Sequence, residues 1–170
     1  MRWVIALLVS GALLEAATLR GLPLGAPRLE VTLIVVVGWA MLRGWEEGLL
    51  AGLIGGLIVD SLSVAPFGVH SLRLGAVGLG AGLLVARWGQ SSPLLPVTAA
   101  ALASVFAFAL SVLALQASGW SVAWERALVT QAIPSAALAA CGMAIGFPVL
   151  RLIERRSTER EDVTDAGVGT

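Results

Sequence analysis

Four ionisable side chains lie within or beside strongly apolar stretches of this sequence: Glu15, Asp60, His70 and Arg73. A carboxylate at membrane depth costs about 2.5 to 3.5 kcal/mol on insertion scales, so Asp60 needs a structural or functional reason to be there. Its oxygens can accept hydrogen bonds from free backbone N–H groups in the 61–68 segment, which makes Asp60 a brace for a bend. Direct contact with a partner protein and the handling of a ligand or proton are the alternatives.

His70 and Arg73 are three residues apart, so on a helix they share one face and can reach Asp60 or Glu15. The simplest interpretation is a pair at the membrane interface, wetted from outside. The sequence offers one histidine and scattered serines, with no metal-ligand spacing and no phosphate loop. We therefore predict a non-enzymatic protein that has no cofactor and no metal.

Small residues recur every fourth position around Asp60. Residues four apart lie on one helix face, where glycines let two helices approach closely in lipid. A ridge of this kind indicates packing within the protein, an interface with a partner, or both. The first ridge leads up to Asp60, and a second follows the bend formed by Pro66 and Gly68; their members are Gly44, Gly48, Gly52 and Gly56, then Gly78, Gly82 and Ala86.

The composition identifies an integral membrane protein. The chain has 170 residues, of which 58% are hydrophobic, and a mean hydropathy of +0.91. Eleven basic residues balance eleven acidic ones, which gives no indication of nucleic-acid binding. The single cysteine, Cys141, excludes an internal disulfide and is expected to act as a small apolar residue.

The apolar runs predict six membrane-spanning helices. Two of the runs hold only 12 and 11 residues, fewer than the roughly 20 that a perpendicular span needs, so we expect them to cross as a hairpin around residues 44–47. Pro134 predicts a kink in the last helix. Loops are expected at 22–27, 87–93 and 119–126, and the helices at 3–19, 31–42, 49–59, 72–86, 96–117 and 127–150.

Arginine positions predict the orientation. With the amino terminus inside, seven arginines are cytoplasmic and four are external, which favours cytoplasmic termini in a bilayer. The sequence after Arg151 is charged and then small and polar. We predict a membrane domain over residues 1–153 and a disordered cytoplasmic tail over 154–170.

One segment carries a family resemblance. Residues 52–60 read Gly-Leu-Ile-Gly-Gly-Leu-Ile-Val-Asp, a glycine-rich helix that ends Gly-Leu-x-x-Asp and is followed by a Pro-x-Gly turn. This pattern, with six short spans and a charged tail, resembles the MreD family of the bacterial rod-shape system. The positions assigned to the motif or to partner binding are Gly48, Gly52, Gly56, Leu57, Asp60, Pro66, Gly68 and Leu72, with Glu15, His70 and Arg73 as a possible polar cluster.

The resemblance implies a scaffold of the inner (cytoplasmic) membrane. Such a scaffold would bind MreC directly and work with MreB, RodA and a class B penicillin-binding protein in lateral peptidoglycan synthesis. The family is also similar in its six-helix fold to the substrate-binding components of energy-coupling-factor transporters. A transporter component that captures a small ligand is therefore the alternative function, although the few polar groups within the spans are a poor basis for high-affinity binding.

Overall fold

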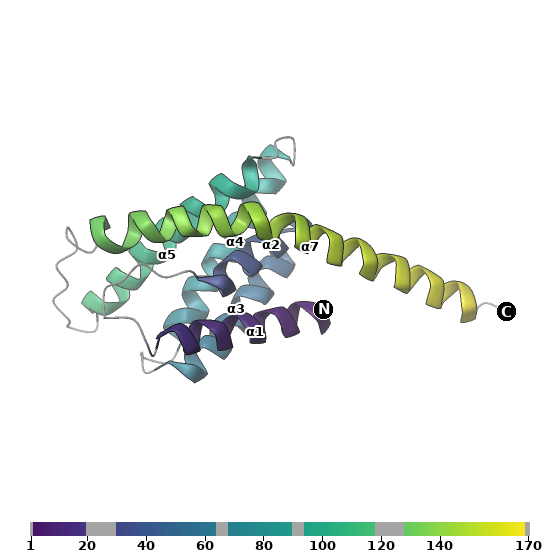
Figure 1. The fold of residues 1–170 in the computed structure, drawn as a ribbon, viewed down its shortest axis with the longest axis horizontal. Helices are drawn as coiled ribbons and strands as arrows, with labels where there is room; N and C mark the ends of the chain where they lie inside the picture. The colour runs from purple at the N-terminus through teal and green to yellow at the C-terminus, as the bar shows by residue number, and fades with distance from the viewer. Residues whose placement is uncertain (1, 20–29, 64–67, 90–93, 118–127, 169–170) are drawn as a thin grey trace.

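The computed structural model describes residues 2–19, 30–63, 68–89, 94–117 and 128–168 (Figure 1). All regular elements within these ranges are helical, which confirms the predicted all-α class. Pro66, the loops predicted at 22–27 and 119–126, and residues 90–93 of the loop predicted at 87–93 lie outside the described residues. Arg87 and Trp88, expected in that loop, are the last residues of a helix. The elements are α1 (Arg2–Leu19), α2 (Val31–Arg43), α3 (Trp45–Leu62), α4 (Val69–Trp88), α5 (Leu95–Ala117), the π-helical segment η1 (Leu128–Ala132) and α7 (Ile133–Val168).

Three of the described helical stretches are long and apolar enough to cross a membrane, namely Val69–Trp88, Leu95–Leu113 and Leu128–Glu154. Two shorter apolar stretches, Val4–Glu15 and Val31–Arg43, accompany them. The chain is therefore a membrane protein, and six complete crossings stay a prediction. The similarity to transporter components likewise stays a prediction.

The α2–α3 connection is tighter than the sequence predicted. Gly44 alone separates the two helices and has a φ of 98°, a conformation that favours glycine. Gly44 therefore ends α2 and does not belong to the glycine ridge, contrary to the prediction. Glu46 and Glu47, expected in the turn, form the first turn of α3. Their negative charge is favourable at a helix amino terminus, which explains why α3 begins four residues early.

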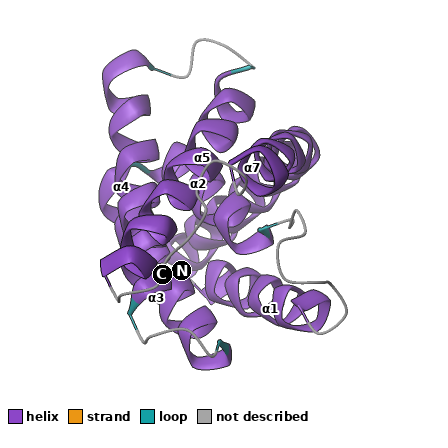
Figure 2. Cartoon of the chain, turned by 90° about the vertical axis from the view of Figure 1, so that its left-hand side faces the viewer, coloured by secondary structure: helices purple, strands orange, loops and turns teal. Residues whose placement is uncertain are grey.

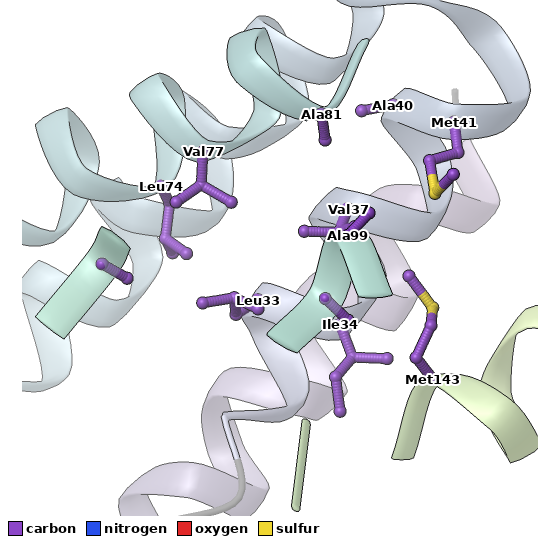
Figure 3. Close-up of a cluster of buried hydrophobic side chains, with 12 residues drawn as sticks. Leu33, Ile34, Val37, Ala40, Met41, Leu74, Val77, Ala81, Ala99 and Met143 are labelled. Atoms are coloured by element: carbon purple, nitrogen blue, oxygen red, sulfur yellow. The ribbon is translucent and has the colours of Figure 1, made fainter. Parts of the chain in front are cut away.

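Helix α2 is the centre of the bundle. It contacts α1, α3, α4, α5 and α7, and its residues from Thr32 to Met41 are all buried. Figure 2 shows the other helices arranged around it. The main hydrophobic cluster joins α2 to α4, α5 and α7 (Figure 3), and it includes Leu33, Ile34, Val37, Met41, Leu74, Val77, Ala99 and Met143.

Helix α7 differs from its prediction at both ends. The kink expected at Pro134 coincides with the change from the π-helical winding of η1 to the α-helical winding of α7. At the other end, α7 continues to Val168 and projects beyond the rest of the bundle (Figure 1). The sequence predicted a disordered tail there, but arginine and glutamate favour helix and no proline interrupts residues 154–168.

Candidate functional site

Asp60 joins the end of α3 to the beginning of α4. Its side chain is fully buried, and its Oδ2 accepts hydrogen bonds from the backbone N–H of Gly68 at 3.0 Å and of Ser71 at 3.1 Å. Ser71 Oγ also donates to Oδ2, at 2.9 Å, while the backbone N–H of His70 donates to Oδ1 at 3.1 Å. One carboxylate thus receives three backbone donors and one hydroxyl.

These contacts make Asp60 a remote cap of α4. The first N–H groups of any helix lack partners within the helix, and a polar side chain at the N-cap usually accepts from them. Here the N-cap is Gly68, which has a φ of 99° and no side chain with which to cap. Asp60 supplies the missing acceptor from the preceding helix.

The bracing interpretation predicted hydrogen bonds of this kind, but it named only part of the donors that the structure describes. Gly68 is a donor as expected, whereas His70 and Ser71 lie beyond the 61–68 segment, in the first turn of α4. The difference arises because α4 begins at Val69, three residues before its predicted start at Leu72. Capping has extended the helix toward the bend.

His70 contributes its ring as well as its backbone. Its Nδ1 lies 2.9 Å from Asp60 Oδ1, so a proton on Nδ1 would complete a fifth hydrogen bond to the carboxylate. The ring is mostly buried, with 22% of the side chain exposed. The pairing of His70 with Asp60, one of the two that the sequence allowed, is present, and both carboxylate oxygens are occupied.

Arg73 has a different partner from those that the sequence suggested. Its Nη1 donates to Glu30 Oε1 at 3.0 Å and lies 3.4 Å from Ser111 Oγ, so it links α4 to the start of α2 and to α5. Glu15 accepts instead from the backbone N–H of Thr32 at 2.7 Å. The three residues predicted to form one cluster therefore have different partners: Thr32 for Glu15, Asp60 for His70 and Glu30 for Arg73.

Sequence reasoning missed Glu30, Ser71 and Ser111. Glu30 had one available signal, because it is a charged residue directly before the apolar run of α2. A charge at that position often marks the beginning of a membrane helix. Its pairing with Arg73, 43 residues away, depends on the tertiary arrangement of α2 and α4.

The glycine ridge of α3 packs against the backbone of α4. A Cβ atom placed on Gly52 would collide with the carbonyl of Leu74, and one on Gly56 would collide with the backbone of Ser71. A Cβ on Gly48 would lie 2.8 Å from the carbonyl oxygen of Gly78. These three glycines are buried inside the protein, which is the internal packing that the sequence left as one of two interpretations.

The second ridge lies against the first. Gly78 faces Gly48, and Gly82 faces Trp45 at the beginning of α3, so α3 and α4 form an antiparallel hairpin in which small residues meet small residues or bare backbone. The two leucines assigned to the motif lie outside this interface. Leu57 is 49% exposed and Leu72 is 72% exposed, so neither belongs to the buried interface.

A second polar network lies at the end of α3 opposite Asp60. Arg43 Nε pairs with Glu154 Oε1 at 3.1 Å, and the Arg43 guanidinium lies over the Trp39 ring. Trp39 Nε1 donates to Glu47 Oε2 at 3.0 Å. This network ties the α2–α3 junction to α7 where the charged part of α7 begins.

The chemistry of both networks is structural. Asp60 accepts hydrogen bonds from backbone N–H groups, whereas Arg73 and Arg43 donate to carboxylates within the chain. In the part of the chain that the structure describes, no three histidine, cysteine or acidic side chains are grouped so as to hold a metal ion. The geometry therefore describes a means of holding helices together.

Comparison with known proteins supplies the identity. The family model described as rod shape-determining protein MreD matches residues 1–150 of the chain. The searches of curated proteins and of solved structures each gave no match. The matched range includes the glycine hairpin, Asp60 and its partners, and the second polar network apart from Glu154, and the match confirms the resemblance to the family. This chain belongs to the MreD family of rod shape-determining membrane proteins.

Proposed function

We propose that this protein is a non-enzymatic scaffold of the rod-shape complex, which binds the membrane helix of MreC and so supports lateral peptidoglycan synthesis and cell shape. Membership of the MreD family supports the role in shape determination. The observation that carries the scaffold mechanism is the α3–α4 hairpin, in which backbone meets backbone and one carboxylate caps the second helix. Such a body presents a surface of fixed shape to a partner.

The exposed leucines of this hairpin are the proposed surface for MreC. Leu53 reaches over Gly75 of α4 and is 40% exposed, and Leu57 follows it one turn later on α3. Leu72 lies on α4 three residues before Gly75. The glycines themselves are covered by α4, so a partner helix would contact these leucines and would not enter the ridge.

The wider assembly would include MreB, RodA and a class B penicillin-binding protein, as the family resemblance implies. We place the chain in the inner membrane with six crossings and both termini in the cytoplasm, and we assign residues 1–153 to the membrane domain and 154–170 to the cytoplasm. The Arg43–Glu154 pair supports this topology, because it brings the α2–α3 junction to the same level as the end of the apolar part of α7.

Co-purification tests the proposed surface. Truncating Leu57 and Leu72 together to alanine should lower the retention of MreC by about tenfold, because apolar contact area at the centre of the interface is lost. The matched control truncates Leu102 and Leu113 of α5, which are 65% and 60% exposed. The control should retain MreC as the wild type does.

Retention of MreC at the wild-type level by both double variants would place the MreC surface elsewhere. A loss in both would indicate a general loss of fold, which thermal melting of the purified variants detects independently. The transporter alternative has no observation in its favour among the described residues, and a small ligand that remains bound after purification would revive it.

A further inference from the structure

The charge-free lengths of α1 and α7 differ by almost a factor of two. Between Arg2 and Glu15, α1 has 12 residues without charge, which span about 18 Å of helix. From Leu128 to Leu150, η1 and α7 have 23 residues without charge, or about 34 Å. A typical hydrocarbon core is about 30 Å thick, so only the second length suffices.

Glu15, which lies four residues before the end of α1, is fixed at its level in the bundle. Glu15 accepts the N–H of Thr32, which ties it to the first turn of α2 at a distance of 2.7 Å. At the other end of the same helix, Val4 belongs to a buried cluster with Trp39. Helix α1 is therefore held along its length and cannot slide to bring Glu15 closer to the membrane surface.

The central helix has the same short dimension. Helix α2 has 13 residues, and charged residues stand at its two ends, Glu30 paired with Arg73 and Arg43 paired with Glu154. Its length is about 20 Å. The charged ends of α1 thus match those of α2, and the short dimension belongs to the fold.

Both helices also present apolar side chains on the outside of the bundle. On α1, Ile5, Val9 and Leu13 are 41%, 38% and 54% exposed. On α7, Leu138 and Ile145 are 39% and 74% exposed. The acyl chains of lipids are the partner that fits such faces, because α7 crosses the membrane and α1 packs on α2 beside it.

Tilting cannot remove the difference between the two lengths. A helix longer than the bilayer is accommodated by tilt, whereas a shorter one is accommodated by thinning of the bilayer, by snorkelling of its flanking side chains or by oligomerisation. The hydrogen bond from Thr32 holds the Glu15 side chain in place and so opposes snorkelling. A tilt that fits the longer run of α7 to the hydrocarbon core does not lengthen the charge-free run of α1. We propose that this protein holds the bilayer at two thicknesses, thinned beside α1 and of full thickness beside α7.

Site-directed spin labelling tests this proposal on the full chain. Nitroxides are attached at Val9→Cys or Leu138→Cys after the native cysteine is removed by Cys141→Ser. The two sites are matched, because they are 38% and 39% exposed and each lies near the middle of its charge-free run. Depth is measured by power saturation with oxygen and a nickel chelate in dioleoyl-phosphatidylcholine vesicles.

The label at position 9 should lie about 6 Å closer to the membrane surface than the label at position 138, which is half the difference between an 18 Å band and a 30 Å core. In vesicles of longer acyl chains, the label at 138 should move deeper while the label at 9 changes little. Equal depths that increase together with chain length would overturn the proposal. Circular dichroism of both labelled proteins confirms that each has kept its helical fold.

Discussion

Glycine has different roles at two interfaces of this protein. Between α3 and α4, Gly52 lies against the backbone of Leu74. Between α2 and α7, a Cβ on Gly38 would meet only side-chain atoms, those of Leu150 and Met143, and a Cβ on Gly146 would lie 3.5 Å from the Ile34 side chain. A side chain can rotate away from an added methyl group, but a backbone atom moves only with its helix. The α3–α4 spacing is therefore fixed, whereas the α2–α7 spacing can adjust.

The polar contacts of the two interfaces differ in the same way. Asp60 has a fully buried side chain and receives several donors from the first turn of α4. Arg43 and Glu154 connect α2 to α7 through side chains that are 34% and 22% exposed. Ion pairs exposed to solvent contribute little to stability. Separating a buried acceptor from its donors lowers the stability of the fold, because both groups then lack a hydrogen-bond partner. The comparison predicts that damage to α3–α4 exceeds damage to α2–α7.

The largest effect is expected from a leucine in the ridge. Gly56→Leu should cost at least about 3 kcal/mol of unfolding free energy, because its side chain meets the backbone of Ser71 and forces the hairpin apart. Gly80→Leu is the control on α4, since a Cβ at Gly80 meets nothing within 4 Å. It should not destabilise the protein, and the better helix propensity of leucine should stabilise it by up to about 1 kcal/mol. Similar melting of both variants in detergent would show that the ridge does not fix the hairpin.

The next effect is expected at Asp60. Asp60→Leu should cost about 1 to 3 kcal/mol, because the first-turn N–H groups of α4 are left without an acceptor. Asp60→Asn should be intermediate, since it keeps one acceptor oxygen where the structure uses two. Thermal melting should therefore rank the wild type first, then Asn, then Leu. An Asn variant that melts with the Leu variant would mean that the charge of Asp60 matters more than its acceptors.

A smaller effect is expected from the Arg73–Glu30 pair. Its side chains are 12% and 27% exposed, so the pair lies between buried and solvated cases. A double-mutant cycle with Arg73→Gln and Glu30→Gln should give a coupling of about 1 to 2 kcal/mol. Costs that simply add in the double variant would contradict the interaction.

The smallest expected effect is a gain in unfolding free energy at the α2–α7 interface, opposite in sign to the losses expected above. Gly146→Ala should stabilise the protein by about 0.5 to 1 kcal/mol, since alanine favours helix and its methyl group has room. Gly52→Ala, with the same gain in propensity, should destabilise, because the methyl group meets the Leu74 carbonyl. Chemical denaturation of the two variants measures both signs, and a matching sign would remove the distinction between the interfaces.

The sequence was sufficient for the bounds of three helices and insufficient for the contacts between helices. Apolar runs between charges and prolines predicted α1, α2 and α5 to within about two residues, because lipid exposure imposes the same pattern on every span. Helix α4 began earlier than predicted because its cap, Asp60, comes from another helix. Sequence periodicity identifies a helix from its own residues and carries no information about a cap supplied by another helix.

The site shows the same limit. The spacing of Gly48, Gly52 and Gly56 identified a contact surface, but it did not reveal that α4 covers that surface. Asp60 stood out because one carboxylate in an apolar run is costly. Glu30 and Arg73 are 43 residues apart, and their pairing follows only from the packing of α2 beside α4.

Amide hydrogen exchange tests most directly the claim that Asp60 closes the α3–α4 hairpin. The N–H groups of Gly68, His70 and Ser71 should exchange slowly in the wild type and rapidly in Asp60→Leu, which has no acceptor, although helix amino termini ordinarily leave such groups unprotected. The first turn of α5, from Leu95, provides the internal comparison. Slow exchange at the three amides in the wild type, lost in the variant, is the predicted result, and exchange in the wild type as fast as in the first turn of α5 would contradict it.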